Sequence, residues 1–165
     1  MARIGITGHQ RLRDPAAWPW VEEVIGRELD AGAKPLVVVT SLAVGADQIA
    51  ARLGIARGAK VHAVLPFSGI ERTFSEEDLQ AYRSLVSQAS VEVLKTSGTD
   101  EDAYLAAGRR VVELSDLLIA VWDGNPAKGK GGTADIVAYA AASGLPVVHI
   151  NPVERRVSRH EPVKS

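Results

Sequence analysis

Three stretches of the sequence combine glycines with side chains that bind anions. They are TGHQRLR at residues 7–13, TSLAVGAD at 40–47 and KGKGGTAD at 128–135. The first two directly follow a run of apolar residues, and the third follows such a run after a predicted turn at residues 123–126. Glycines leave backbone amides unobstructed, hydroxyl and imidazole groups add hydrogen-bond donors, and lysine or arginine adds positive charge. This combination suits a phosphate or a carboxylate, so the sequence predicts a binding site for a small anionic ligand.

In the first stretch, Gly8 would let the backbone approach a ligand, and His9 and Arg11 are candidate ligand-binding side chains. The competing interpretation is an ordinary solvated loop, because loops are generally polar.

The second stretch leaves a β-branched run and enters a helix near Gly45, where free amides and the positive end of the helix dipole would face a ligand. Ser41, Gly45 and Asp47 are the candidate binding residues here. Alternatively, Gly45 is only a flexible corner and Asp47 only favours the helix dipole.

The third stretch is a glycine-rich, basic loop that leads into a helix, and Gly131, Gly132 and Thr133 are its candidate phosphate-binding residues. It lacks the Gly-Lys-Ser/Thr end of a Walker A loop and the three-glycine dinucleotide fingerprint. A flexible connection with solvated lysines is the alternative.

The surrounding pattern explains how three distant loops could meet. Continuously apolar runs are typical of buried parallel strands, and they alternate with segments of helical periodicity. The predicted strands are residues 3–7, 35–40, 60–65, 116–122 and 146–150, with a weaker one at 91–95. Helix start signals lie between them, at Asp14-Pro15, Ser75 and Thr99. We therefore predict an α/β fold with a single doubly wound, mostly parallel Rossmann-like sheet and helices on both faces.

Length and pattern predict one domain over residues 1–152. Residues 153–165, VERRVSRHEPVKS, are charged and lack periodicity, so we expect a flexible C-terminal tail.

Composition narrows the function classes. Nineteen Lys and Arg against twenty Asp and Glu give a formal net charge of -1, which makes nucleic acid an unlikely partner by charge. There is no cysteine, and the four histidines show no ligand spacing, so we expect no metal and no cofactor. Neither a signal peptide nor a run of about 18 apolar residues is evident, which indicates a cytoplasmic protein with no membrane partner.

Two of the stretches resemble known families. TSLAVGADQIA is similar to the SGLAxGID segment of the DNA-processing protein A family, with Leu42, Ala43, Gly45, Asp47 and Ala50 at matching positions. KGGTAD, which follows SDLLIAVWDG, resembles the Gly-Gly-x-Gly-Thr-x-Glu element of the Lonely Guy phosphoribohydrolases. Both families belong to the SLOG superfamily of Rossmann-like proteins that bind nucleotides or nucleotide-derived ligands, and the resemblance covers about residues 2–150.

The resemblance implies that Gly131, Gly132 and Thr133 bind phosphate and that Asp135 stands where the phosphoribohydrolases carry a catalytic Glu. Arg109 and Arg110 would correspond to their basic pair, at a shorter spacing from the Ser-Asp that follows. Asp135 is one methylene shorter than Glu, and Ala51 stands where the DNA-processing family has His.

These observations lead to three functional hypotheses. The first is binding of a nucleotide or a nucleotide-derived phosphorylated ligand at the carboxyl ends of the strands, where parallel sheets bind ligands. The second is hydrolysis of the N-glycosidic bond of a nucleoside monophosphate, with Asp135, Arg109 and Arg110 as catalytic residues. The third and weakest is a DNA-binding module. We also expect a homo-oligomer, because homodimers are common in the resembled family and the alanine-rich helices around residues 102–112 and 134–143 permit close packing.

Overall fold

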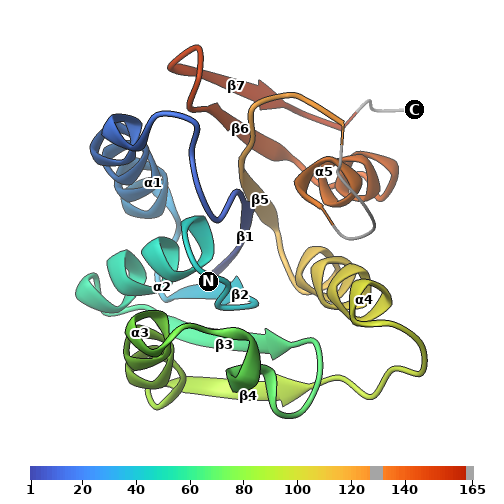
Figure 1. The fold of residues 1–165 in the computed structure, drawn as a ribbon. Coiled ribbons are helices and arrows are strands. Elements are labelled where there is room, and N and C mark those ends of the chain that lie inside the picture. The colour runs from blue at the N-terminus through green and yellow to red at the C-terminus, as the bar shows by residue number, and fades with distance from the viewer. Residues whose placement is uncertain (127–131, 163–165) are drawn as a thin grey trace.

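The structure, a computed structural model, describes residues 1–126 and 132–162, and these form a single sheet of seven strands in the order β4-β3-β2-β1-β5-β6-β7 (Figure 1). The strands are β1 (Ala2–Gly8), β2 (Leu36–Thr40), β3 (Lys60–Leu65), β4 (Ala89–Val93), β5 (Leu117–Val121), β6 (Val147–Asn151) and β7 (Arg156–His160). All neighbours pair in parallel except β6 and β7, which are antiparallel. The six predicted strands are confirmed.

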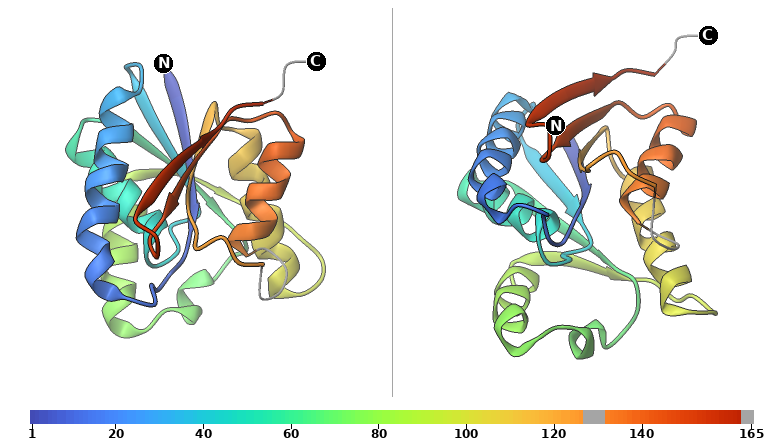
Figure 2. Two further views of the ribbon diagram at one scale, coloured as in Figure 1. Left: turned by 90° about the horizontal axis from the view of Figure 1, so that it is seen from above. Right: turned by 45° about the horizontal axis from the view of Figure 1, so that its top comes forward.

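Helices cover both faces of this sheet (Figures 1 and 2). On one face lie α1 (Trp18–Ala31), α2 (Ala46–Ala56) and α3 (Glu76–Val86), and on the other lie α4 (Asp100–Glu113) and α5 (Thr133–Ala142). Two short 3-10 turns, Pro15–Ala17 and Ile70–Thr73, precede α1 and α3. The doubly wound, mostly parallel architecture is confirmed. Within the described residues, none of these helices has the length and apolar character that a membrane span requires.

The predicted helix starts have the expected caps. Asp14 accepts a hydrogen bond from the Ala16 amide at 3.0 Å, although it caps the 3-10 turn rather than α1 itself. Thr99 and Asp102 form a reciprocal capping box, with the Thr99 hydroxyl on the Asp102 amide at 3.2 Å and the Asp102 carboxylate on the Thr99 amide at 3.1 Å. An aspartate therefore performs the return half of the box that glutamate or glutamine usually performs.

Two apolar clusters, one on each face of the sheet, form the core. The α1–α3 side contains fully buried Val21, Ile25 and Leu29 from α1, and the α4–α5 side contains Val111, Ile136 and other residues. The helices α4 and α5 approach closely at Gly108, because a Cβ there would lie 2.3 Å from Cδ1 of Ile136. A larger residue at position 108 would therefore push α4 and α5 apart.

The C-terminal segment differs from the expectation. Residues 156–160 were predicted to belong to a flexible tail, and this prediction is wrong, because they form β7 and pair with β6. Arg159 also forms an ion pair with Glu28 of α1, which ties the strand to the body of the domain. The domain therefore extends past the predicted boundary at residue 152. The charged pattern that indicated a tail is the one that exposed edge strands carry.

Candidate ligand-binding site

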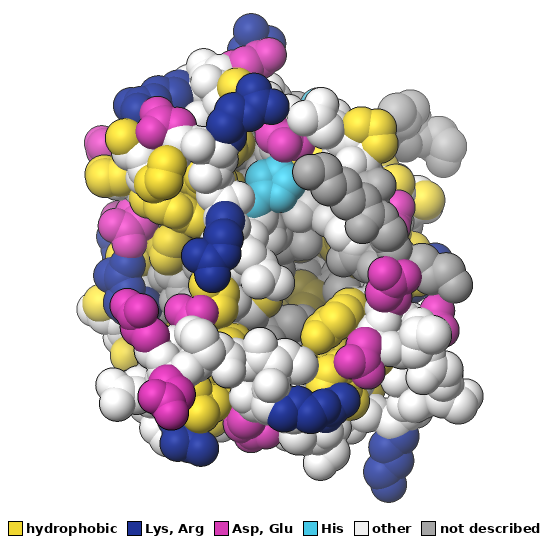
Figure 3. Space-filling view, in the orientation of Figure 1, with side chains coloured by type: hydrophobic (Ala, Val, Ile, Leu, Met, Phe, Trp, Pro, Cys, Tyr) yellow, Lys and Arg dark blue, Asp and Glu magenta, His cyan; other side chains and the backbone are white. Residues whose placement is uncertain are grey.

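A cavity of about 580 Å³ lies over the carboxyl ends of β1 and β5. The chain runs from β1 to β2 on one side, while β5 pairs with β1 on the other, so the strand order reverses at this point. Such a reversal leaves a crevice, and it is where open α/β sheets bind ligands. The space-filling view shows a hollow on this face, with a histidine and basic side chains at its edge (Figure 3).

Most of the predicted binding residues meet here. The cavity is lined by Gly8, His9, Arg11, Ser41, Asp47, Gly132 and Thr133. Gly45 lines a second cavity instead, between α1, α2 and α3, and Gly131 lies outside the described residues. The predicted catalytic residues Asp135, Arg109 and Arg110 are not among the described residues that line the site.

The first loop is tied to the end of β5. The His9 amide donates to the Val121 carbonyl at 3.0 Å, and His9 Nε2 accepts a hydrogen bond from the Asp123 amide at 3.0 Å. Burial would raise the pKa of the Asp123 carboxyl, but a hydrogen bond from the Asn125 amide and the nearby His9 outweigh it, so the pKa lies below its usual value. This pairing places Arg11 and Arg13, which follow in the loop, along the wall of the cavity.

The second loop is organised by the buried side chain of Asp47, which is 6% exposed. Its Oδ2 atom accepts hydrogen bonds from the amides of Ser41 and Ala43, at 3.2 and 3.3 Å. Burial raises the pKa of Asp47 to about 7, against the effect of these hydrogen bonds. Asp47 therefore holds the loop after β2 in place, a larger role than favouring a helix dipole.

Gly45 has a structural reason to be glycine. Its φ is +92°, and a Cβ would lie 2.5 Å from the His9 carbonyl oxygen and 2.6 Å from that of Gln10. The Ala46 amide, the first of α2, donates to the His9 carbonyl at 3.3 Å. The loop after β1 thus crosses directly over the start of α2, and the predicted direct contact between Gly45 and a ligand is replaced by a contact between two loops.

The start of α5 is the helix terminus that does face the cavity. Gly132 is its N-cap and contributes no side-chain cap, and Thr133 and Ala134 also line the cavity. The first amides of any helix lack partners within the helix, and they carry the positive end of its dipole. This terminus therefore presents hydrogen-bond donors of the kind that bind phosphate.

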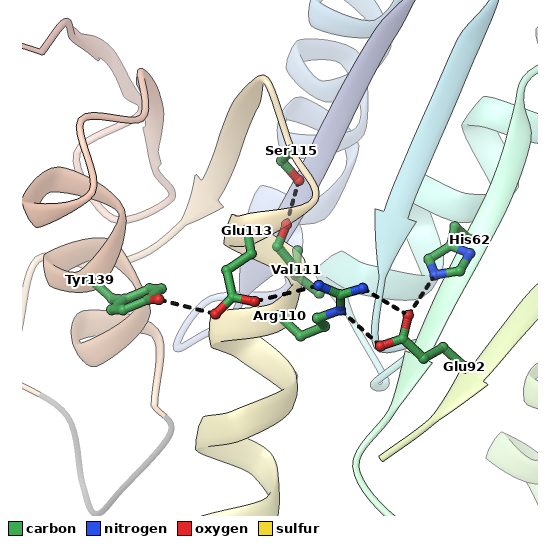
Figure 4. A network of polar contacts seen from close by, with 7 residues as sticks. All are labelled: His62, Glu92, Arg110, Val111, Glu113, Ser115 and Tyr139. Atoms are coloured by element: carbon green, nitrogen blue, oxygen red, sulfur yellow. Dashed lines mark hydrogen bonds and ion pairs between the residues drawn. The ribbon is translucent and has the colours of Figure 1, made fainter.

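Arg110 belongs to a network of polar contacts that links β3 and β4 to α4 and α5, away from the cavity (Figure 4). Its Nε donates to Oε2 of Glu92 at 2.8 Å, and it forms an ion pair with Glu113 at 3.5 Å. Glu92 also faces His62 at 3.4 Å, and the Tyr139 hydroxyl donates to Glu113. The hydrogen bond from Arg110 holds the pKa of Glu92 below its usual value, even though burial opposes it.

Arg109 lies with its guanidinium 5.2 Å from the centre of the Tyr139 ring. Both arginines are thus accounted for by contacts with residues of β4, α4 and α5.

Residues outside the set of predicted binding residues complete the cavity. Arg13, Tyr104, Trp122, Asp123 and Asn125 line it as well. The place of Tyr104 at the cavity depends on the rotation of α4 about its axis. The turn at 123–126 reaches the cavity through the contact of Asp123 with His9, which links positions 114 residues apart.

No family model matches the sequence, and no curated protein matches it significantly. Several solved structures do match the fold of this chain. DNA processing protein A from Streptococcus pneumoniae aligns with a TM-score of 0.65 and 19% identity, over 90% of this chain and 50% of that one. The Helicobacter pylori protein aligns with a TM-score of 0.66 and 19% identity, over 90% and 64%. TM1055 aligns with a TM-score of 0.57 and 18% identity, over 89% of this chain and 72% of that one.

The chain has the mostly parallel, Rossmann-like α/β fold of DNA processing protein A and TM1055. It spans about half the length of the Streptococcus pneumoniae protein and less than two thirds of the Helicobacter pylori one. At these identities the likeness concerns the fold. Since the Helicobacter pylori protein binds single-stranded DNA, the prediction from net charge that nucleic acid is an unlikely partner is not supported.

Proposed function

We propose that this protein binds a phosphorylated, nucleotide-type small molecule in the cavity over β1 and β5. The observation that carries the proposal is the convergence of the α5 N-terminus with Arg11 and Arg13 on one cavity at the strand-order reversal. Helix amides and guanidinium groups are the two protein groups best suited to phosphate oxygens.

The charges that line the cavity favour an anion. Among the described lining residues the formally charged ones are Arg11, Arg13, Asp47 and Asp123. Both carboxyls already accept hydrogen bonds from the protein, and the pKa of Asp47 is raised to about 7 by burial. The two guanidinium groups and the helix terminus therefore dominate the field that a ligand meets.

The size of the cavity also fits a small ligand. Its volume of about 580 Å³ lies within the range of roughly 300–1,000 Å³ typical of small-molecule sites. A single-stranded nucleic acid would instead track along a longer basic groove with stacked bases.

Thermal unfolding with AMP, ADP-ribose, ribose 5-phosphate and a short oligothymidylate as separate probes tests the proposal. A ligand at about 100 times its Kd contributes roughly 2.7 kcal/mol. That raises the Tm of a chain of this length by roughly 5–10 °C.

Arg11→Ala and Arg13→Ala should each weaken binding by about tenfold or more, because hydrogen bonds to charged groups are worth about 1.5–3 kcal/mol. Arg27→Ala, at an exposed arginine of α1 that lines neither cavity, is the matched control. No shift with any phosphorylated probe would contradict the proposal, and a shift with the oligonucleotide alone would favour the DNA-binding alternative.

The hydrolase alternative requires a carboxylate at the sugar. Asp135 lies in the first turn of α5 but does not line the cavity, so the geometry lends this alternative no support. Chromatography for free base released from AMP tests it. If the parent releases adenine and Asp135→Asn does not, the alternative is correct and the binding site extends to Asp135.

A further inference from the structure

The cavity is divided into a polar part and an apolar part. His9, Arg11, Ser41 and Thr133 supply the polar part. The apolar part includes one face of α4, where Tyr104, Gly108 and Val111 follow each other at helical spacing, together with Ile6 and Ile136. A sugar phosphate alone would leave this apolar wall in contact with water, whereas a flat aromatic ring would cover it.

Tyr104 is the aromatic residue of that wall and is 38% exposed. Six large hydrophobic side chains are exposed among the described residues, and two of them, Tyr104 and Val153, line this one cavity. Three of the others lie on the edge strands β4 and β7, and the last is Met1. Tyr104 is therefore an aromatic ring that is exposed inside a cavity and not at a sheet edge or a terminus, so a ligand in the cavity can contact it.

Packing from behind holds the Tyr104 ring in place. The ring of Phe67, from the loop after β3, lies 5.7 Å from it at an angle of 55°. The Arg72 guanidinium lies 4.7 Å from the Phe67 ring centre and forms an ion pair with Asp100, in the first turn of α4, at 3.8 Å. Tyr104 is thus supported from the side of β3, and a ring that is already ordered loses little conformational entropy when it binds.

Gly108, one helical turn after Tyr104, has no side chain to project into the cavity. The position of its missing Cβ lies 2.3 Å from Cδ1 of Ile136, so the side chain of α5 fills the space beside the helix. Both residues line the cavity, and together they leave an apolar surface next to the aromatic ring.

We infer that Tyr104 is the platform on which a nucleobase stacks, so that the ligand is a nucleoside phosphate and not merely the phosphate ester of a sugar. The inference rests on the proposed function, since the phosphate would be bound by Arg11, Arg13 and the start of α5. Stacking of a base on an aromatic side chain is worth about 1–3 kcal/mol and tolerates different bases.

Calorimetry with AMP and ribose 5-phosphate as paired probes tests the inference. The parent should bind AMP more tightly than ribose 5-phosphate, by roughly 5- to 150-fold. Tyr104→Ala should remove most of this preference while leaving the affinity for ribose 5-phosphate unchanged, and Tyr104→Phe should keep the preference, since the ring is retained. Tyr104→Leu, which keeps apolar bulk against Phe67 without a π-face, gives the same test if the alanine variant does not fold.

Two outcomes overturn the inference separately from the proposed function. Equal affinity of the parent for AMP and ribose 5-phosphate means that the base is not bound. Equal loss of both affinities in Tyr104→Leu means that the residue only shapes the cavity. If neither probe binds the parent, the proposed function fails and the inference fails with it.

Discussion

Replacing Asp47 with asparagine tests the account of the loop after β2. In the folded protein the pKa of Asp47 is raised to about 7, from a value of 3.8 in the absence of burial. The folded state therefore binds a proton more tightly than the unfolded chain, so the contribution of Asp47 to stability is full at low pH and is lost as the pH rises through about 7. Between pH 5.5 and 8.5 the free energy of unfolding should fall by about 2 kcal/mol through this group.

Asp47→Asn should lack this loss. Both loop amides donate to a single oxygen, Oδ2, so the amide oxygen of asparagine can accept both bonds. Urea unfolding at pH 5.5, 7 and 8.5 gives the free energy of unfolding for each protein. The stability of the variant relative to the parent should rise by about 2 kcal/mol between the lowest and the highest pH.

All other ionisable groups are the same in the parent and the variant, so the difference between the two proteins isolates Asp47. If the parent and the variant change in parallel across this range, the carboxyl is not desolvated as described and the reasoning fails.

Three further predictions concern stability and assembly. Tyr82→Phe should leave stability unchanged or raise it by up to about 1 kcal/mol, because the buried Tyr82 hydroxyl has no hydrogen-bond partner among the described residues; a clear loss in urea unfolding would reveal one. Glu92→Gln should lower the free energy of unfolding by up to about 1 kcal/mol at pH 7, because the hydrogen bond from Arg110 lowers the pKa of Glu92. This stabilisation is present above about pH 4.5 and is lost as the pH falls through the folded-state pKa, so an equal cost at pH 3 would contradict it. Light scattering should give at least twice the 17.5 kDa mass of one chain if copies associate through α4 and α5, and a monomer mass at micromolar concentration would refute that expectation.

The central strands could be predicted because parallel strands with helices on both faces are buried on both sides and become continuously apolar. The segment 117–121 is an example, with four of its five residues buried. The edge strand β7 could not be predicted, because it has one free edge and carries the polar residues Arg156, Ser158 and Arg159. Edge strands carry charged residues just as flexible tails do.

The location of the cavity was also predictable, because the carboxyl ends of parallel strands share one edge of the sheet. The role of each residue was harder to predict from the sequence. Gly45 and Gly8 look alike in the sequence, and close packing requires glycine at both, under the loop that crosses Gly45 and against Ala46 and Val121 at Gly8. Only Gly8 lines the cavity over β1 and β5. Whether Tyr104 and Arg110 reach the cavity depends on the rotation of α4 about its axis. The helical pattern alone defines an apolar face and does not give this rotation.

The binding site itself is tested most directly by following the backbone amides of the labelled protein by NMR during a titration with AMP. We predict that the largest shift changes fall on residues 8–13, 41, 43 and 132–134, which line the cavity over β1 and β5. Shift changes concentrated instead around Trp18, Ile49 and Leu85, which line the second cavity between α1, α2 and α3, would contradict it, and so would a saturating titration that moves no amide.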